Sequence, residues 1–324
     1  MAETKPTPSD LLVQAEKSMD ILLGMDALAD AGDVLARDEW LDARAERVEA
    51  PGDNGKVRLV RRVTASNAGK IVGAKPFKSS PTMEEYARQV ATGEDKLPLA
   101  NVVRARWGHY MEPVAIKAVR DTFGHPTVGC NRMYADQKDQ SISCTLDGVI
   151  IPSDDTFGAD YSLCHALVEK REDGEVLDVE WAERIARYLQ NKIGTVGVLE
   201  IKTTGGFWVD KSLKTEPSEH RETWGCPEVW AHQVQVQMNI CGLEWGMLAA
   251  VTQGNALRCW IVERDQQWYD EVFRPAVFQF QGALEGYEYA HDQMMSAKDD
   301  EEAPVLSPEQ RHRNQYHADS MPKG

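Results

Sequence analysis

The sequence predicts an α/β domain built around a mixed β-sheet flanked by helices. Short apolar runs bounded by glycine or turn residues lie at 141–151, 196–204 and 245–263, which is typical of buried strands. Segments with helical periodicity precede, separate and follow these runs, as in a layered α/β domain. Acidic side chains stand at the ends of predicted strands, where such sheets place their sites.

The size and composition fit one large domain with extensions, or two smaller ones. The chain has 324 residues, a mass of 36.3 kDa and 42% hydrophobic residues, enough for a sizeable core. It contains no run of 18 apolar residues, and its first residues lack the charged-then-apolar pattern of a signal peptide. We therefore expect a cytoplasmic protein without a membrane span.

The cysteines and the net charge exclude some classes of protein. The six cysteines form no C-x-x-C pair, which favours buried reduced thiols over a disulfide framework or a structural zinc site. The net charge of -16 argues against a surface coated by polyphosphate, but it leaves room for a local basic groove that binds DNA.

The first part of the chain predicts an extension and a candidate anion site. Residues 1–38 carry eight acidic and three basic residues in a helical pattern, so we expect an acidic helical extension. A turn-rich linker and the basic strand 56–62 follow. In the next segment Thr64 or Ser66 can cap a helix, whose first N–H groups either bind an anion or are simply capped.

Two helices and a strand pair follow. Residues 82–99 and 101–122 have helical patterns, and the second contains Glu112 followed by Pro113, which should kink or restart the helix. Strands are expected over 127–130 and 141–151. Within the latter, Asp147-Gly148 indicates either a hairpin turn or a bulge that aims Asp147 into a site.

The strand predicted at 196–204 places two charges on an apolar element. Residues 152–195 are acidic and have the character of an insertion, with a helix over 179–192. In the strand, the period of two puts Val198, Glu200 and Lys202 on one face. Burying such charges is unfavourable unless they are paired or bind a metal, and the alternative is a solvated face of an edge strand.

The last third of the domain completes the pattern. The helix predicted at 227–243 has Gln233 and Gln237 on one face and Gln235 on another. A hairpin over 245–263 and a helical segment over 266–295 follow, and from Ser296 on the composition predicts a disordered tail. The expected packing set of the last helical segment is Trp268, Val272, Val277, Phe280 and Leu284.

If the strands that carry Asp147 and Glu200 pair, their carboxylates can share a divalent cation, because adjacent strands lie about 4.8 Å apart. Hard oxygen ligands suit Mg²⁺, with Mn²⁺ as a substitute and the backbone carbonyl of Ile201 as a third ligand. Lys202 could then orient or deprotonate a water molecule, or stabilise developing negative charge on a phosphodiester.

Seven short motifs, in order, carry a resemblance to a known family. They are Trp40-x-x-x-Arg44, Val63-Thr-Ala-Ser66, Trp107-Gly-His-Tyr-Met-Glu112-Pro113, Thr145-Leu-Asp147-Gly148, Leu199-Glu-Ile-Lys202-Thr203, Trp230-Ala-His-Gln233-Val-Gln235 and Ile261-Val-Glu-Arg-Asp265. The chain resembles the phage lambda exonuclease family, also called YqaJ-like viral recombinases, within the PD-(D/E)XK nuclease superfamily. The motifs cover most of residues 39–290.

The resemblance implies a 5′→3′ exonuclease that degrades one strand of linear duplex DNA and exposes 3′ single strands for recombination. By resemblance, the metal-binding acids are Asp147 and Glu200, the catalytic lysine is Lys202, the supporting helical glutamate is Glu112 and the site glutamine is Gln233. One departure is the gap of 53 positions between the two acids (200 − 147), which fits an insertion at 152–195.

The resemblance also implies a site for the 5′-phosphate of the DNA. Ser66 and Arg44 match the residues that hold this phosphate in the family. The segment between them is lengthened, so Arg61 or Arg62 could replace Arg44. Trp230 stands where the family has a tyrosine-like residue before the glutamine.

The remaining implications concern assembly and context. By resemblance, we expect a domain over 39–295, a ring-shaped homotrimer, a single-strand annealing protein as partner, and a phage or mobile-element origin in a bacterial cytoplasm. Two alternatives stay open: another nuclease of the superfamily, such as a RecB-like one, and a non-catalytic DNA-end-binding or scaffold protein. An iron–sulfur relative is excluded because clustered cysteine ligands are absent.

Overall fold

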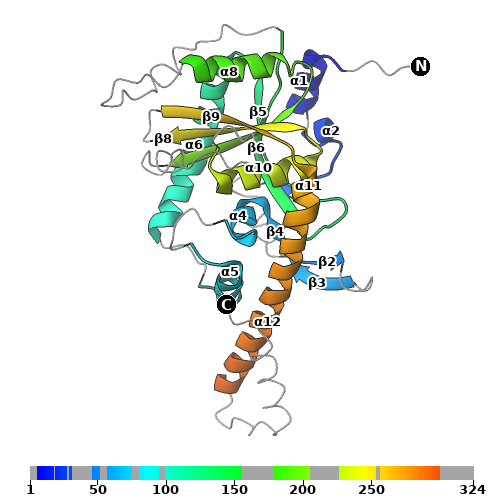
Figure 1. Cartoon of the computed structure of the whole chain (residues 1–324), viewed down its shortest axis with the longest axis vertical. Helices are drawn as coiled ribbons and strands as arrows, with labels where there is room; N and C mark the ends of the chain where they lie inside the picture. Colours follow the sequence, from blue (N-terminus) through cyan, green and yellow to red (C-terminus); the bar gives the residue numbers. More distant parts are fainter. Residues whose placement is uncertain are drawn as a thin grey trace, which may run out of the picture.

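The computed structural model describes a mixed α/β protein with a central sheet and helices on both faces (Figure 1). The described residues are 6–17, 19–27, 29–30, 46–51, 57–74, 80–94, 99–154, 179–204, 226–252 and 256–299. Within them the predicted fold class is confirmed.

The described strands of the central sheet lie in the order β1-β5-β6-β7-β8-β9, and β4 adds to β6. β4 runs parallel to β6 and β7 parallel to β8, whereas the other neighbours are antiparallel. The bounds are β1 (Ala29–Asp30), β4 (Val63–Thr64), β5 (Thr127–Ala135), β6 (Ile142–Ile150), β7 (Gly197–Thr204), β8 (Trp245–Thr252) and β9 (Ala256–Glu263). A separate hairpin consists of β2 (Arg47–Pro51) and β3 (Val57–Arg61).

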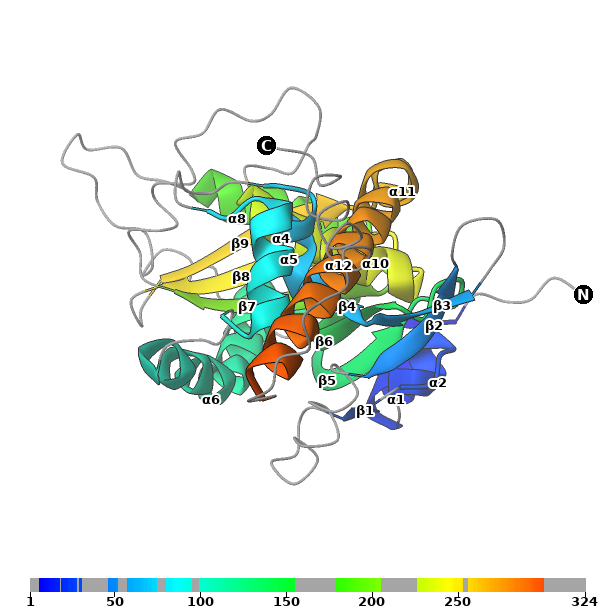
Figure 2. The same ribbon diagram turned by 90° about the horizontal axis from the view of Figure 1, so that it is seen from below.

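The helices are α1 (Pro8–Lys17), α2 (Met19–Leu23), α4 (Ala68–Ile71), α5 (Met83–Thr92), α6 (Leu99–Phe123), α8 (Val179–Gln190), α10 (Glu228–Cys241), α11 (Gln266–Trp268) and α12 (Arg274–Asp299). Figure 2 shows α12 lying beside α5, and their Tyr86 and Phe280 rings stack at 5.5 Å. None of the described helices is both long and apolar enough to cross a membrane.

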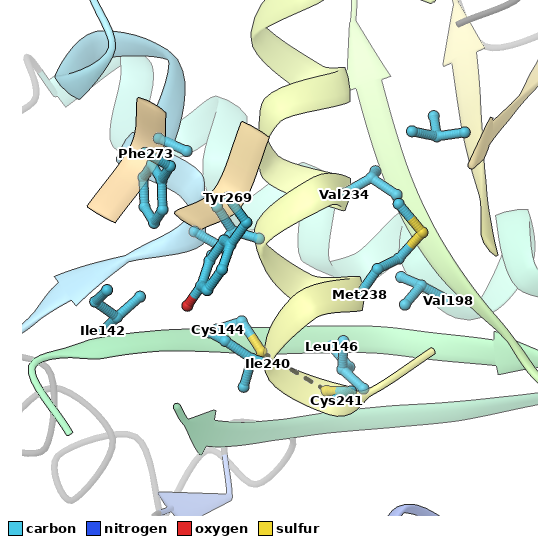
Figure 3. Close-up of a cluster of buried hydrophobic side chains, with 14 of the residues drawn as sticks. Ile142, Cys144, Leu146, Val198, Val234, Met238, Ile240, Cys241, Tyr269 and Phe273 are labelled. Carbon is cyan, nitrogen blue, oxygen red and sulfur yellow. Dashed lines mark hydrogen bonds between the residues drawn. The ribbon is translucent and has the colours of Figure 1, made fainter. Parts of the chain in front are cut away.

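Two apolar clusters lie on opposite faces of the sheet, and β7 contributes to both. Val198 packs with Val234 and Met238 of α10 (Figure 3), whereas Leu199 and Ile201 pack on the face covered by α6 and α8. The predicted faces of this strand are therefore confirmed. The edge-strand alternative is wrong, because β7 pairs with β6 on one side and β8 on the other.

A core substitution in β7 should be costly. Leu199 is fully buried, so Leu199→Ala is expected to lower the free energy of unfolding by about 2–5 kcal/mol, measured by urea denaturation. Leu59→Ala on β3, where the side chain is 57% exposed, should change it by less than about 0.5 kcal/mol. Equal losses in the two variants would contradict this packing.

The Asp147-Gly148 pair does not form a hairpin turn, because β6 runs through it. Leu146 and Val149 both pack in the cluster on the α10 face, so the alternation of β6 shifts between them. The neighbouring strand β5 has an extra residue here, since Gly129 faces Gly148 and Arg132 faces Leu146. This irregularity supports the alternative in which the backbone aims Asp147 into a site.

Gly148 allows the close approach of β5, because a Cβ atom there would lie 2.7 Å from the Val128 carbonyl oxygen. The described cysteines are free thiols, as expected; Cys144 and Cys241 approach each other with Sγ atoms 4.0 Å apart (Figure 3), and Cys164 lies outside the described residues.

One member of the predicted packing set of the last helices is wrong. Val272 is 46% exposed, although the four others are buried. Residues 269–273 form a π-helical turn. The extra residue in such a turn shifts the phase of the helix, so that Tyr269 and Phe273 are buried in place of Val272.

The predicted extensions and insertion are described only in part. α1 and α2 pack on the domain through Leu11, Ala15 and Met19. α8, within the predicted insertion, contributes Ile185 and Leu189 to the core beneath the sheet, and α12 runs to Asp299. α6 does not restart at Pro113, which lies inside one helix. The boundaries at 38, 152–195 and 296 stay predictions.

Candidate active site

The carboxylate of Glu200 is the most deeply buried charge in the described part of the sheet, with 1% of the residue exposed. Its Oε1 atom accepts hydrogen bonds from Gln233 Nε2 at 2.6 Å and from Lys202 Nζ. Its Oε2 atom accepts one from Gln237 Nε2 at 2.5 Å. These donors compensate for the water that the carboxylate loses on burial.

Asp147 lies beside Glu200 because β6 and β7 separate at this point. Their described pairing runs from Ile150 and Gly197 to Gly148 and Leu199. Beyond it, Asp147 Oδ2 accepts a hydrogen bond from the Ile201 backbone N–H at 2.8 Å. Burial raises the pKa of Asp147 well above its usual value, and the nearby charge of Glu200 raises it further.

Lys202 supplies the positive charge of the site. Burial acts to lower the pKa of Lys202, but the carboxylates of Glu200, Asp147 and Glu112 outweigh it, so the net shift is upward. The ammonium group is therefore held in its charged form.

Glu112 reaches the same site from α6. Burial raises its pKa, whereas His109, whose Nδ1 lies 3.1 Å from Glu112 Oε2, acts to lower it. α6 passes close to β7 at Gly108, where a Cβ atom would lie 2.9 Å from Thr203 Oγ1. The structure thus brings together all five residues that the sequence predicted as catalytic: Glu112, Asp147, Glu200, Lys202 and Gln233.

Sequence reasoning missed Gln237 as a site residue, although its spacing of four from Gln233 placed both on one helix face. Gln235 points elsewhere, as predicted. Its Nε2 donates to the Glu263 carbonyl oxygen at 2.6 Å, and its Oε1 accepts from the Asp265 N–H at 2.8 Å. Gln235 therefore ties α10 to the end of β9.

The residues predicted to hold DNA phosphate come from several separate parts of the chain. Arg44 lies outside the described residues. Ser66 is exposed in a 3₁₀ turn that packs on α10, with its Oγ 3.0 Å from Thr64 Oγ1. Thr64 makes no side-chain capping bond to this turn.

The two arginines of the basic strand have other partners. Arg61 Nε lies 2.7 Å from Glu288 Oε1 on α12. Arg62 is buried; one of its Nη atoms lies 3.2 Å from Glu46 Oε2, and its Nε donates to the Gln140 carbonyl oxygen. Trp230 is half-buried, with its ring centre 6.5 Å from that of Trp260.

The donor set of the site fits a hard divalent cation. Asp147 and Glu200 offer carboxylate oxygens, and Ile201 offers its carbonyl group. Within the described ranges, no group of three His, Cys, Asp or Glu side chains is placed to hold a metal ion. Mg²⁺ needs no such cage, because one or two carboxylates, water and substrate phosphates complete its coordination.

Solved structures similar in shape share little sequence with this chain. An alkaline exonuclease from Laribacter hongkongensis, LHK-Exo, has 17% sequence identity to this chain and a TM-score of 0.46. The alignment covers 80% of this chain and 98% of the LHK-Exo chain. A phage-related exonuclease from Haemophilus somnus 129PT has 12% identity and a TM-score of 0.43, with 72% and 97% covered. No curated protein sequence matches the chain.

The sequence model of the YqaJ-like viral recombinase domain matches residues 39–244. This range contains the strands β6 and β7 and the helices α6 and α10, which carry the predicted site residues. Since it spans more than half of the chain, the protein belongs to the YqaJ-like viral recombinase family.

Proposed function

We propose that the protein is a Mg²⁺-dependent exonuclease that degrades one strand of linear duplex DNA in the 5′→3′ direction. The observation that carries this proposal is the convergence of Asp147, Glu200 and Lys202 where β6 and β7 separate. Membership of a viral recombinase family supports DNA as the substrate.

In this proposal Asp147 and Glu200 would hold the metal with the Ile201 carbonyl, and Mn²⁺ could substitute. The bound cation would supply Lewis-acid stabilisation of charge on the scissile phosphate. Lys202 orients the attacking water and stabilises the developing negative charge. Gln233 and Gln237 fix the Glu200 carboxylate, and Glu112, which contacts His109, adds a third carboxylate near Lys202.

We further propose that Ser66 and an arginine bind the 5′-phosphate. The candidates are Arg44, Arg61 and Arg62, of which Arg61 and Arg62 pair with carboxylates in the described structure. From family membership we also propose a ring-shaped homotrimer, a single-strand annealing partner and a location in the cytoplasm of a bacterial host.

A non-catalytic DNA-end-binding protein is the second candidate. It is disfavoured by Lys202 and the carboxylates around it, since burying such charges together is unfavourable and brings no advantage to a binding module.

The test is digestion of linear duplex DNA that carries a 5′-phosphate at one end only, with Mg²⁺ or with EDTA. A label at each 3′ end distinguishes the strands. We expect Mg²⁺-dependent loss of the strand that begins with the phosphate, while its complement stays intact. Loss from 3′ ends would contradict the polarity. Intact DNA under all conditions, together with a gel shift, would support the binding protein instead.

A further inference from the structure

Gln237 is a fully buried polar side chain on the face of α10 that lies over β6 and β7. Its Nε2 atom donates to Glu200 Oε2 on β7 at 2.5 Å. The same atom donates to the Thr145 carbonyl oxygen on β6 at 2.9 Å. One side-chain amide thus spans the two strands that carry the acids of the site.

The bridge lies where the backbone no longer fixes the distance between these strands. The described β6–β7 pairing ends at Gly148 and Leu199. Beyond that point, the side chain of Asp147 accepts a hydrogen bond from the Ile201 N–H. Side chains therefore replace backbone pairing across this gap. Asp147 reaches from β6 to β7, and Gln237 reaches both strands from α10.

Gln237 also completes the orientation of the Glu200 carboxylate. Gln233 and Lys202 both bind Oε1, and rotation about the last side-chain bond of a glutamate is soft. The Gln237 amide holds Oε2, the other oxygen. With both oxygens held, the plane of the carboxylate is fixed.

The orientation of the Gln237 amide is forced by its neighbours. Its Oε1 atom is buried without a hydrogen-bond partner among the described residues. Turning the amide over would instead place this oxygen against the Glu200 carboxylate and the Thr145 carbonyl, two acceptors. An unsatisfied buried oxygen is unfavourable, so the bridge is maintained at the expense of stability.

We propose that Gln237 is a positioning residue, which sets the spacing and orientation of Glu200 relative to Asp147 for metal binding. This inference rests on the metal-dependent nuclease activity proposed above. Loss of the bridge leaves the Glu200 charge in place. However, one carboxylate oxygen is no longer held, and the distance between the two strands is no longer fixed by this side chain. The expected defect is weaker Mg²⁺ binding.

The test compares Gln237→Leu with Gln235→Leu. Both side chains are buried on the same helix and each makes two hydrogen bonds, but those of Gln235 reach Glu263 and Asp265 outside the site. We expect similar losses of thermal stability in the two variants. Only Gln237→Leu should weaken Mg²⁺ binding to the DNA-free protein, by tenfold or more in calorimetry.

Kinetics supply a second readout. Gln237→Leu should raise the Mg²⁺ concentration for half-maximal cleavage by at least tenfold and lower kcat, with the KM for DNA unchanged. Gln237→Met keeps the length of the side chain without a hydrogen-bond donor, and it should have the same effects as Gln237→Leu. It replaces Gln237→Leu in the test if the leucine variant does not fold.

The outcomes separate this inference from the proposed function. Wild-type protein that cleaves DNA, beside a Gln237→Met variant with unchanged Mg²⁺ affinity and dependence, would overturn the role of Gln237 alone. Wild-type protein that neither binds Mg²⁺ nor cleaves DNA would overturn both. Wild-type binding of Mg²⁺ that is weakened in Gln237→Met and retained in Gln235→Leu would support the inference.

Discussion

Asp147→Asn is expected to lower Mg²⁺-dependent DNA cleavage by at least about 10³-fold, the equivalent of about 4 kcal/mol of transition-state stabilisation. The substitution removes one of the two carboxylate charges proposed to hold the metal. The asparagine oxygen can still accept the hydrogen bond from the Ile201 N–H, so the backbone between β6 and β7 should be preserved. The measurement is the initial rate of digestion at saturating Mg²⁺.

The same variant should not be destabilised in the absence of metal. Burial raises the pKa of Asp147 in the folded state, so the ionised carboxylate opposes folding, and this penalty grows as pH rises above the ordinary aspartate pKa of 3.8. Asparagine removes that penalty. Near neutral pH, the free energy of unfolding of the metal-free variant should equal or exceed that of the wild type.

Mg²⁺ should stabilise the wild-type protein but not the Asp147→Asn variant. A ligand at 100 times its dissociation constant stabilises the folded state by about 2.7 kcal/mol, and this gain should appear for the wild type and be lost in Asp147→Asn. Asp292→Asn, which changes the same charge on an 81% exposed side chain of α12, is the matched control. Retention of more than a tenth of wild-type cleavage by Asp147→Asn would refute the assignment.

Lys202→Met is expected to lower cleavage by about 10³-fold while leaving the metal-binding carboxylates in place. The ammonium group is proposed to orient water and to stabilise charge in the transition state, and removal of one such donor typically has an effect of 10²–10³. The measurement is kcat at saturating Mg²⁺ and DNA.

Lys202→Met should also lower the melting temperature of the metal-free protein. Without Lys202, the charges of Glu200, Asp147 and Glu112 are no longer offset, so the metal-free variant should melt at a lower temperature than the wild type. Added Mg²⁺ should restore most of the melting temperature, because it replaces the lost positive charge, but it should not restore cleavage.

Lys192→Met is the control, since Lys192 has similar exposure and lies 3.9 Å from Glu263, outside the site. Its melting temperature should change little and should not depend specifically on Mg²⁺. Cleavage by Lys202→Met within tenfold of the wild-type rate would mean that Lys202 neither orients the attacking water nor stabilises the developing charge.

The elements that hold the site were predictable because their signals are local. The alternation of β7 depends only on the strand period of two, and it correctly placed Glu200 opposite Leu199 and Ile201. The four-residue spacing on α10 likewise placed Gln233 and Gln237 on one face. The strand period and the assumed pairing of the two strands placed Asp147 near Glu200 and Lys202, and the ordered motifs supported the same grouping.

Other features depended on residues far apart in the chain. The π-helical turn at 269–273 moved Val272 to the surface, and no local pattern marked it. The partner of Arg61, Glu288, stands on a helix at the other end of the domain sequence. The contacts of Gln237 with Thr145 and Glu200 depend on the separation of β6 and β7 next to this side chain.

The sequence by itself determined the α/β class, the two faces of β7 and the residue types of the site, because side-chain periodicity and chemistry are properties of neighbouring positions. The tertiary structure alone decided which strand lies at the centre and where β6 and β7 stop pairing. It also decided which donors hold each oxygen of Glu200. Those outcomes depend on packing between distant segments, since a buried charge takes whichever donors the surrounding elements bring within hydrogen-bonding distance.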